Sequence, residues 1–495
     1  MKVSQMKSTI IKSLFTLVAI FAVSCSDDYL DINTDPNNPT SASPDLILPV
    51  AQRYSAFIQE DYNGQNKLGN YFMYNWSQSY GFAFITTEFY YTVSSTFYTQ
   101  IFDRTYSKAL KQYNVLSEFQ GEQYGYYHAI NIIMKCYHIQ LMVDIYGDVP
   151  YFEAFKRADN PTPAYDDSKT IYLDLVSELT RAIEIINNLS GNNGIEAVLP
   201  GGDDVMFGGD MSQWKSFANT VKLRILVRMS DLEDQQDFIK KSFEEINSEG
   251  SGFMGQDVKI QLGFANEQTK MNPKWEMYGR DVQGNETAFN KATCATQYVI
   301  DILTDTSDPR IDFIYEEPDT GHLGVEQGVV DENLGPENVS NLGVGILRSP
   351  SQASVLYTLA ECYFNQAEAA LKGLMPGEAK SLYEQGIQAS FDYLGAGDAS
   401  TYYSQNLDLV SWEASLNKLE AIITQKWIAT NSIDAIQSWF DYSRTGYPSN
   451  LPISTLAPTA DRPVRLAYPS SELSSNGANV PEQPDFFTDK IFWAN

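Results

Sequence analysis

One stretch of this chain is apolar on almost every side of the helix that it predicts. Residues 129–146 read AINIIMKCYHIQLMVDIY. At helical spacing, the polar side chains of Asn131, Lys135 and His138 fall on one narrow stripe, and Gly147 follows as a helix-ending residue. A helix of this kind has to be covered by other elements nearly all round. The chain must therefore build a helical array around it.

Other segments carry the same helical periodicity. Residues 170–189 place apolar side chains on one face, and Ser168 is the expected N-cap. Residues 355–372 and 378–394 predict two helices joined by a short Gly/Pro turn. Alanines and Gly386 on their inner faces would let the two helices approach closely. We therefore expect paired helices along much of the chain.

These helix pairs resemble tetratricopeptide-type repeats, although no clean period of ~34 residues can be fixed. The helical pattern continues through residues 411–431 and 432–442. Two turn-rich blocks, at about 190–211 and 248–350, interrupt it. We predict a mainly α fold, a tetratricopeptide-like helix-pair array with an irregular, loop-rich second lobe.

The first residues indicate a processing signal and not a part of the fold. Basic residues such as Lys2 precede an apolar run at 14–23, and small Ala22 and Ser24 precede Cys25. That run is short for a membrane-spanning helix, which needs ~20 apolar residues. The pattern resembles a bacterial lipobox, and an ordinary secretory signal with an incidental thiol is the alternative.

This cleavage site sets the predicted domain organisation. Residues 1–24 are a lipoprotein signal peptide, 25–45 a lipidated flexible tether and 46–495 a single helical domain with the loop-rich insertions. Acyl chains on Cys25 would anchor the protein, since each buried CH₂ contributes ~0.8 kcal/mol. The acidic SDD at 26–28 is similar to the surface-export signal of Bacteroidetes lipoproteins.

Charge and cysteine content exclude several classes of partner and scaffold. The 34 basic and 63 acidic residues give a net charge of −29, which disfavours nucleic acid and anionic lipid headgroups. Beyond Cys25, the odd set Cys136, Cys294 and Cys362 contains no CxxC pair, which argues against a zinc site. A single bridge between Cys294 and Cys362 is left open.

The sequence offers no positive sign of an enzyme. It contains none of the HExxH, GxSxG, P-loop or GxGxxG motifs, and only three histidines. Acidic neighbours such as Glu316 and Glu317 are more simply explained as a solvated face. We expect no catalytic residue, no metal and no cofactor.

Aromatic density is the unusual feature of the sequence. Residues 71–91 contain ten aromatics in twenty-one, interleaved with amides and hydroxyls. Most should be core, but some could form a stacking platform for sugar rings. We select Trp76 as its best member, with Tyr80 and Asn75 beside it. Trp275 and Tyr278, in a Gly/Asn-rich loop at 272–285, are the second candidate group.

Four collinear segments together resemble the SusD/RagB family of outer-membrane lipoproteins. The match covers nearly the whole chain after the signal peptide. The segments are the lipoprotein start with YLDINTDPNNPT, then DIYGDVPYFEAF with PTPAYDDSKTIYLDLVSELTRAI, DVMFGGDMSQWKSFANTVKLRILVRMSD, and RLAYPSSELSSNGANV together with the helix pair at 355–394.

The resemblance implies a helical, repeat-containing receptor that sits as a lid on a SusC-like TonB-dependent transporter. Such a protein captures glycans or other nutrients, including peptides, at the cell surface. The family's ligand surface also draws on an aromatic residue in the early region, which favours Trp76. The alternatives are an extracellular glycan-degrading hydrolase on a helical scaffold, and a structural or adhesive surface lipoprotein.

Overall fold

The computed structural model describes residues 42–82, 86–191 and 194–494. The predicted signal peptide, the lipidation site Cys25 and most of the predicted tether lie outside these residues. The last tether residues, Pro44 and Asp45, are the first residues of a helix instead. From Ile47 onward, the described residues form one compact unit.

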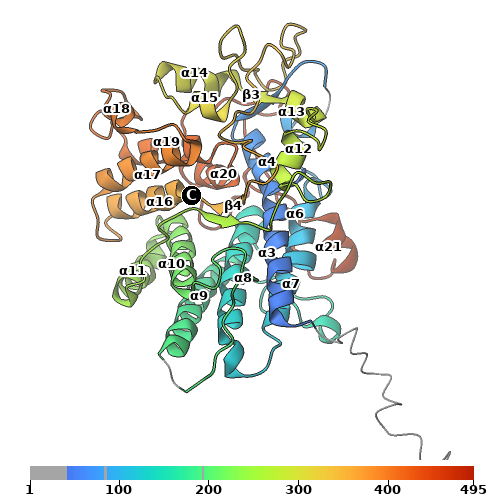
Figure 1. Cartoon of the computed structure of the whole chain (residues 1–495), viewed down its shortest axis with the longest axis vertical. Coiled ribbons are helices and arrows are strands. Elements are labelled where there is room, and N and C mark those ends of the chain that lie inside the picture. Colours follow the sequence, from blue (N-terminus) through green and yellow to red (C-terminus); the bar gives the residue numbers. More distant parts are fainter. Residues whose placement is uncertain (1–41, 83–85, 192–193, 495) are drawn as a thin grey trace, which may run out of the picture. The chain divides into compact units, whose positions relative to one another are not determined.

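Helices make up most of the regular structure, as predicted (Figure 1). The N-terminal part contains α3 (Pro44–Glu60), α4 (Gln65–Phe72), α5 (Thr86–Phe89), α6 (Thr99–Arg104), the π-helix η1 (Thr105–Leu110), α7 (Lys111–Leu116), η2 (Glu122–Tyr124), α8 (Gly125–Tyr146), η3 (Arg157–Asp159), α9 (Ser168–Ser190), α10 (Met211–Arg228), η4 (Glu233–Gln235) and α11 (Gln236–Glu249). The C-terminal part contains α16 (Leu359–Leu371), α17 (Ala379–Leu394), α18 (Ser400–Tyr403), α19 (Lys418–Thr430), α20 (Ile436–Thr445) and α21 (Ser470–Ser475).

Between these two parts lies the loop-rich lobe that the sequence predicted. Its short elements are β2 (Val258–Ile260), α12 (Pro273–Tyr278), α13 (Ala288–Ala292), β3 (Thr293–Ala295), α14 (Gln297–Asp305), α15 (Ile311–Ile314) and β4 (Ser354–Tyr357). β3 pairs antiparallel with β1 (Trp76–Gln78) in the register Trp76↔Ala295. β2 pairs antiparallel with β4.

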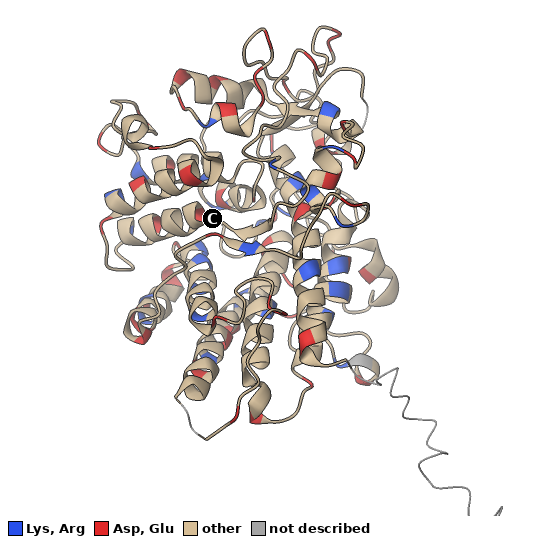
Figure 2. Cartoon of the chain, in the orientation of Figure 1, with Lys and Arg blue, Asp and Glu red and all other residues tan. Residues whose placement is uncertain are grey.

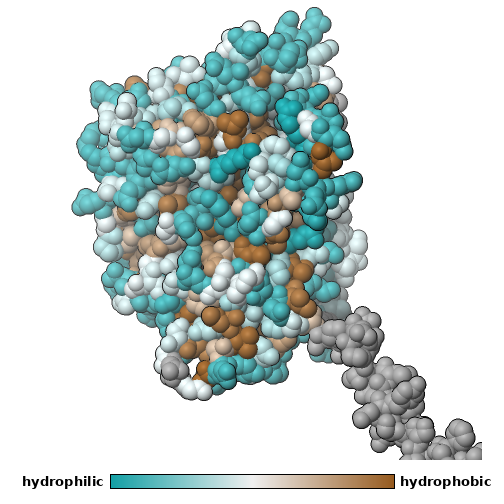
Figure 3. Space-filling view, viewed as in Figure 1, coloured by the Kyte–Doolittle hydropathy of each residue, from teal (hydrophilic) through white to brown (hydrophobic). Residues whose placement is uncertain are grey.

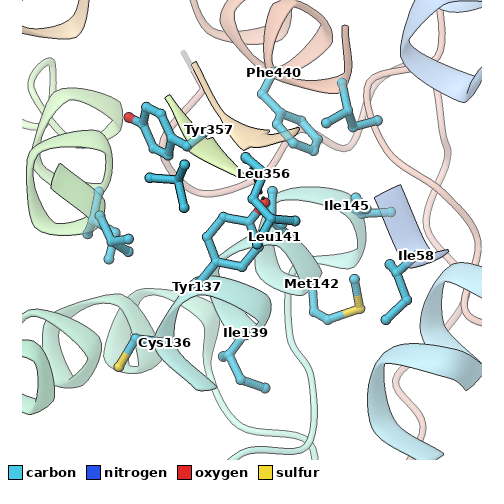
Figure 4. Packing of buried hydrophobic residues seen from close by; sticks show 14 of the residues in the cluster. Ile58, Cys136, Tyr137, Ile139, Leu141, Met142, Ile145, Leu356, Tyr357 and Phe440 are labelled. Carbon is cyan, nitrogen blue, oxygen red and sulfur yellow. Dashed lines mark hydrogen bonds between the residues drawn. The ribbon is translucent and has the colours of Figure 1, made fainter. Parts of the chain in front are cut away.

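The helix that is apolar all round, α8, lies in the centre of the core. It begins at Gly125 and ends before Gly147, whose φ of 80° favours glycine. Figure 4 shows Tyr137 of α8 beside Leu356 of β4, where the Tyr137 hydroxyl donates to the Leu356 carbonyl at 3.0 Å, and Met142 of α8 on the side of Ile58 of α3. The polar stripe is also enclosed, because His138 is buried and its Nε2 lies 2.8 Å from Ser55 Oγ. The prediction of a covered helix is confirmed.

Successive helices pack as neighbours, with α8 on α9, α9 on α10, and α16 on α17. Gly386 makes the last contact possible, because a Cβ there would lie 2.7 Å from Phe364 Cε1. Several boundaries differ from the prediction, among them the helices expected at 411–431 and 432–442, which begin at Lys418 and Ile436. The N-cap of α9 is Asp167 and not Ser168, since the Asp167 side chain accepts from Thr170 N. Residues 354–357 pair as β4, so the helix expected from residue 355 begins at Leu359.

The proposed bridge between Cys294 and Cys362 does not form. Both thiols are free and buried in the described part of the chain, as is Cys136. Cys294 packs in a small cluster with Val325 and Val339, whereas Cys362 belongs to the main core. Burial raises the pKa of Cys362 to about 12, so this thiol is a small hydrophobic group and not a nucleophile.

No helix within the described ranges combines the length and apolar character that a membrane span requires. The face of the molecule in Figure 3 is largely hydrophilic, with small apolar groups scattered over it.

Candidate functional site

Three of the predicted ligand-binding residues lie in the interior. Trp76 has no exposed surface, and its Nε1 donates to Ser432 Oγ at 2.7 Å. Asn75 is equally buried, and Tyr278 is 2% exposed. The rings of Trp76 and Tyr278 are 5.1 Å apart, in a T-shaped contact. A ring without a free face cannot stack on a sugar, so the assignment of these three residues as ligand contacts is wrong in this structure.

The reason is that residues 76–78 form a strand within the core. β1 lies beside β3, and Gln327 Nε2 donates to the Trp76 carbonyl at 2.8 Å. The Asn75 carbonyl accepts from Thr296 N at 3.1 Å and from the Tyr315 hydroxyl at 3.0 Å. These partners are distant in the sequence and enclose the segment. The polar residues next to Trp76 in the sequence do not reveal them.

Tyr80 is placed at the surface, two residues after β1. It is 44% exposed, and its backbone N donates to the Leu334 carbonyl at 2.7 Å. The preceding Ser79 is tied to α13, because Ser79 Oγ donates to the Lys291 carbonyl at 2.7 Å. The backbone on both sides is therefore fixed, while the phenol ring is available to a ligand.

Trp275 is half-buried on the short helix α12. Asn272 caps this helix by accepting from Trp275 N at 3.0 Å, and Pro273 occupies its first turn. The indole lies over Gly279, where a Cβ would approach Trp275 Cδ2 to 2.7 Å. The missing side chain of Gly279 thus sets the orientation of the indole.

A pocket of about 440 Å³ opens beside α13. Its polar lining consists of four carboxylates, two amides and one amine, namely Glu286, Glu316, Glu317, Glu337, Asn290, Asn341 and Lys291. Asn290 Nδ2 donates to the Tyr278 carbonyl at 2.7 Å, which links the pocket wall to the helix that carries Trp275. Since Ser79 binds the Lys291 carbonyl, Tyr80 is attached to the same wall.

The pocket has unused hydrogen-bonding capacity. Asn341 Oδ1 is buried and finds no partner among the residues that the structure describes. Burial raises the pKa of Glu316, and the nearby Glu286 carboxylate raises it further. Carboxylate and amide oxygens accept from hydroxyl groups, and the amide N–H groups can donate. The lining is therefore suited to a ligand that carries many hydroxyl groups.

Sequence reasoning missed the pocket residues themselves. Local sequence favours a solvated face for Glu316 and Glu317, and it does not mark Asn290 or Asn341. Their segments meet only through tertiary contacts, such as Glu316 N donating to the Asn341 carbonyl at 2.8 Å. The one available signal was the dense run of Glu, Asn, Gly and Pro in the block at 248–350.

One group of potential metal ligands lies at the edge of this region. Asp312, Glu317 and His322 can each present a ligand atom, all within 4.8 Å of one another. His322 Nε2 already contacts Asp312 Oδ1 at 2.9 Å, and His322 Nδ1 lies 3.0 Å from Ser340 Oγ. Both carboxylates are exposed, so surface hydrogen bonds of a fixed imidazole account for the geometry.

A helical-repeat array of this kind is the architecture of SusD-like proteins. The family model described as "Starch-binding associating with outer membrane" matches residues 36–469. The chain belongs to the SusD-like family, as the resemblance in its sequence indicated.

Solved structures agree with this assignment of the fold. A chitin-binding SusD homologue from Flavobacterium johnsoniae has a TM-score of 0.77 and 22% identity, covering 91% of this chain and 98% of its own. A SusD homologue from Bacteroides uniformis has a TM-score of 0.73 and 24% identity, covering 91% and 99%. One from Bacteroides thetaiotaomicron has a TM-score of 0.70 and 20% identity, covering 92% and 99%. Comparison with curated proteins gives no match.

Proposed function

We propose that this protein is a cell-surface lipoprotein that captures glycans and delivers them to a SusC-like TonB-dependent outer-membrane transporter. The observation that carries this proposal is the family match over residues 36–469, whose description joins starch binding to the outer membrane. The solved relative from Flavobacterium johnsoniae is described as chitin-binding, which adds a second glycan to the class. The protein binds its ligand and does not cleave it.

The pocket beside α13 is the ligand site in this proposal. Its carboxylates and amides would hydrogen-bond sugar hydroxyls, and Tyr80 and Trp275 would offer aromatic surface to the C–H faces of sugar rings. Trp76 and Tyr278 take a different role. Their buried ring contact joins β1 to α12 and so holds the exposed groups in place.

The lipid anchor is placed on Cys25, after a signal peptide at 1–24. The predicted tether that precedes α3 would give the helical domain freedom to move above the membrane. A lid over a transporter pore has to open and close while it stays attached, and a tethered receptor allows this. The acidic SDD at 26–28 would direct the lipoprotein to the outside of the cell.

Recovery of the transporter tests the delivery step. Membranes that contain the full chain are solubilised in mild detergent, crosslinked gently and purified through this protein. We expect a barrel of the SusC-like TonB-dependent class to co-purify, since a lid needs a large, specific interface. The Cys25→Ala variant is the control for nonspecific recovery. If the wild-type sample contains no such barrel and only the proteins that the control also recovers, delivery to a transporter is contradicted.

A further inference from the structure

A second pocket lies between three helices of the repeat array. It has a volume of about 520 Å³ and is lined by residues of α9, α10 and α11. These helices lie at the lower left of Figure 1, whereas α12 and α13 lie at the upper right. The second pocket is therefore separate from the candidate site beside α13.

Two buried polar side chains of α10 line this pocket with unused hydrogen-bonding capacity. Lys222 is 2% exposed, and its Nζ donates to Thr180 Oγ1 at 2.9 Å. This is its one hydrogen bond to the described part of the protein, although an ammonium group has three donors. Asn219 is fully buried, and its Oδ1 has no partner within the described ranges. Both residues lie on one face of α10, because they are three positions apart.

The Asn219 amide is fixed by its other end. Its Nδ2 donates to the Gly252 carbonyl at 3.2 Å and to Glu249 Oε2 at 3.3 Å. Its orientation therefore follows from these two contacts, and Oδ1 is the acceptor that is left over. An unpaired buried donor or acceptor destabilises the protein, so a ligand that pairs both groups would be favoured.

Most of the charged side chains in the lining are acidic. Glu184 of α9 and Glu245 and Glu249 of α11 face the pocket, and Figure 2 shows charges of both signs on these helices. An anionic ligand would be repelled by these carboxylates. A sugar hydroxyl can accept from Lys222 and donate to Asn219 Oδ1 or to a carboxylate, so it satisfies all three kinds of group.

We propose that this pocket is a second saccharide-binding subsite, which takes the end of an uncharged sugar chain through Lys222 and Asn219. The volume lies within the usual 300–1,000 Å³ of small-molecule sites. The choice of ligand class rests on the proposed glycan-binding function. The site itself rests on the unpaired Asn219 Oδ1, the Lys222 ammonium group with its one hydrogen bond to the described residues, and the pocket that both residues line.

Ligand binding at this site should change the protonation of Lys222, and this change can be measured. Burial lowers the pKa of Lys222 to about 8, while Glu245, Glu249 and Glu184 oppose the effect. The other charged residues that line the pocket are Lys241 and Glu244 of α11. A sugar oxygen that accepts from Nζ favours the charged amine and raises its pKa. Binding at pH 8 should therefore take up protons, to a maximum of about half a proton per site.

The test uses the full chain, purified in detergent, in a Tyr80→Ala/Trp275→Ala background that removes aromatic contacts at the first site. Glucose, N-acetylglucosamine and maltose are titrated calorimetrically at pH 8 in two buffers of different ionisation enthalpy. We expect at least one sugar to bind with proton uptake. Lys222→Met should weaken its affinity roughly tenfold or more, since a hydrogen bond from a charged group is lost.

Two further variants keep the result interpretable. Ser248→Trp places an indole on an exposed lining position and should block binding even if Lys222→Met fails to fold. Lys240→Met, at an exposed position of α11 outside the lining, should bind as the parent does. If none of the three sugars binds, or if Ser248→Trp binds as tightly as the parent, the proposal is overturned. The glycan-binding proposal for the first site is tested by a different measurement. It is contradicted if protein with the wild-type sequence is not retained on polysaccharides.

Discussion

At the scale of residues, exposure separates the aromatic side chains that can meet a ligand from those that stabilise the fold. Tyr80 is 44% exposed and Trp275 is half-buried, whereas Trp76 has no exposed surface. All three stand among polar residues in the sequence. Only the tertiary partners of β1, which lie more than two hundred residues away, distinguish Trp76 from the other two.

Substitution of these aromatics should therefore divide into two classes. Tyr80→Ala and Trp275→Ala should weaken glycan binding roughly tenfold, because a stacking contact contributes ~1–3 kcal/mol in comparable base-stacking sites. Their melting temperatures should change little. Trp76→Ala should instead lower the free energy of unfolding by about 3–5 kcal/mol, as for a core aromatic. Calorimetric titration and thermal unfolding of the same samples measure both quantities, and normal stability of Trp76→Ala would contradict its assignment to the core.

The Glu316 carboxylate should make glycan binding depend on pH. It has to be charged to accept strongly from a sugar hydroxyl, and its pKa is raised by burial and by Glu286 above the ordinary 4.5. Affinity should thus be full well above the raised pKa and fall as pH decreases through it. In Glu316→Gln, this acid-side loss should be absent. An unchanged pH profile in that variant would show that Glu316 does not contact the ligand.

At the scale of elements, a buried ion pair joins α16 to α20. Arg444 of α20 donates from both terminal nitrogens to Glu368 of α16, at 2.6 and 2.8 Å, and Lys372 lies 3.1 Å from the same carboxylate. Glu368 and Arg444 are almost completely buried. Removing one partner would leave the other charge in the interior, so the pair fixes how the two helices pack.

Glu368→Gln should lower the free energy of unfolding by about 3–5 kcal/mol at neutral pH. Burial alone would raise the pKa of Glu368, but Arg444 and Lys372 outweigh it and hold the pKa at about 2. Because this pKa lies below the unfolded value of 4.5, the difference between wild type and variant should be full above pH 4.5. It should shrink as pH falls towards 2. Denaturant unfolding across this range measures it, and Glu413→Gln in the exposed pair with Lys380 is the control. A difference that does not vary with pH would rule out the ion pair as its source.

The contact between α16 and α17 depends on one missing side chain. A Cβ on Gly386 would approach the buried Phe364 ring to 2.7 Å, so Gly386→Ala overpacks the interface. Overpacking costs ~1–3 kcal/mol, against a gain in helix propensity of ~1 kcal/mol. We expect a net loss of about 1 kcal/mol in the free energy of unfolding. Gln385→Ala, at the neighbouring exposed position, should not destabilise the protein, and equal stability of both variants would contradict the close approach.

The elements also show what the sequence could predict. The periodicity of residues 129–146 is strong enough to identify α8 as a covered helix, and Gly386 correctly marked a close helix contact. Residues 354–357 also fit a helical pattern, but they form strand β4 because they pair with β2. The two strands are almost one hundred residues apart in the sequence. Short strands of this kind are decided by tertiary pairing and not by local spacing.

At the scale of the whole molecule, the family and the helical-repeat fold could be read from the sequence, but the pocket could not. Helical periodicity is a local property, and the family motifs follow one another along the chain, so both can be recognised in the sequence. The wall that carries Glu316, Asn290 and Asn341 forms only when turn-rich segments fold against one another, so no motif marks it.

The lipid anchor is a prediction that concerns the whole protein. Cys25→Ala should move the protein out of the membrane fraction, because the acyl chains that provide ~0.8 kcal/mol per buried CH₂ are then absent. Replacing both Asp27 and Asp28 by Ala should leave it in membranes but protect it from external protease. Fractionation and protease treatment of intact cells measure the two effects. Recovery of Cys25→Ala in membranes at the wild-type level would contradict the assignment of the anchor.

Retention on polysaccharides tests the central claim most directly. The purified full chain is incubated with a panel that includes insoluble starch and chitin, and bound protein and released soluble sugars are both measured. We predict retention by at least one polysaccharide, no release of soluble products, and weaker retention of Tyr80→Ala and Trp275→Ala. Release of soluble oligosaccharides, or no retention by any member of the panel, would contradict a glycan-capturing protein.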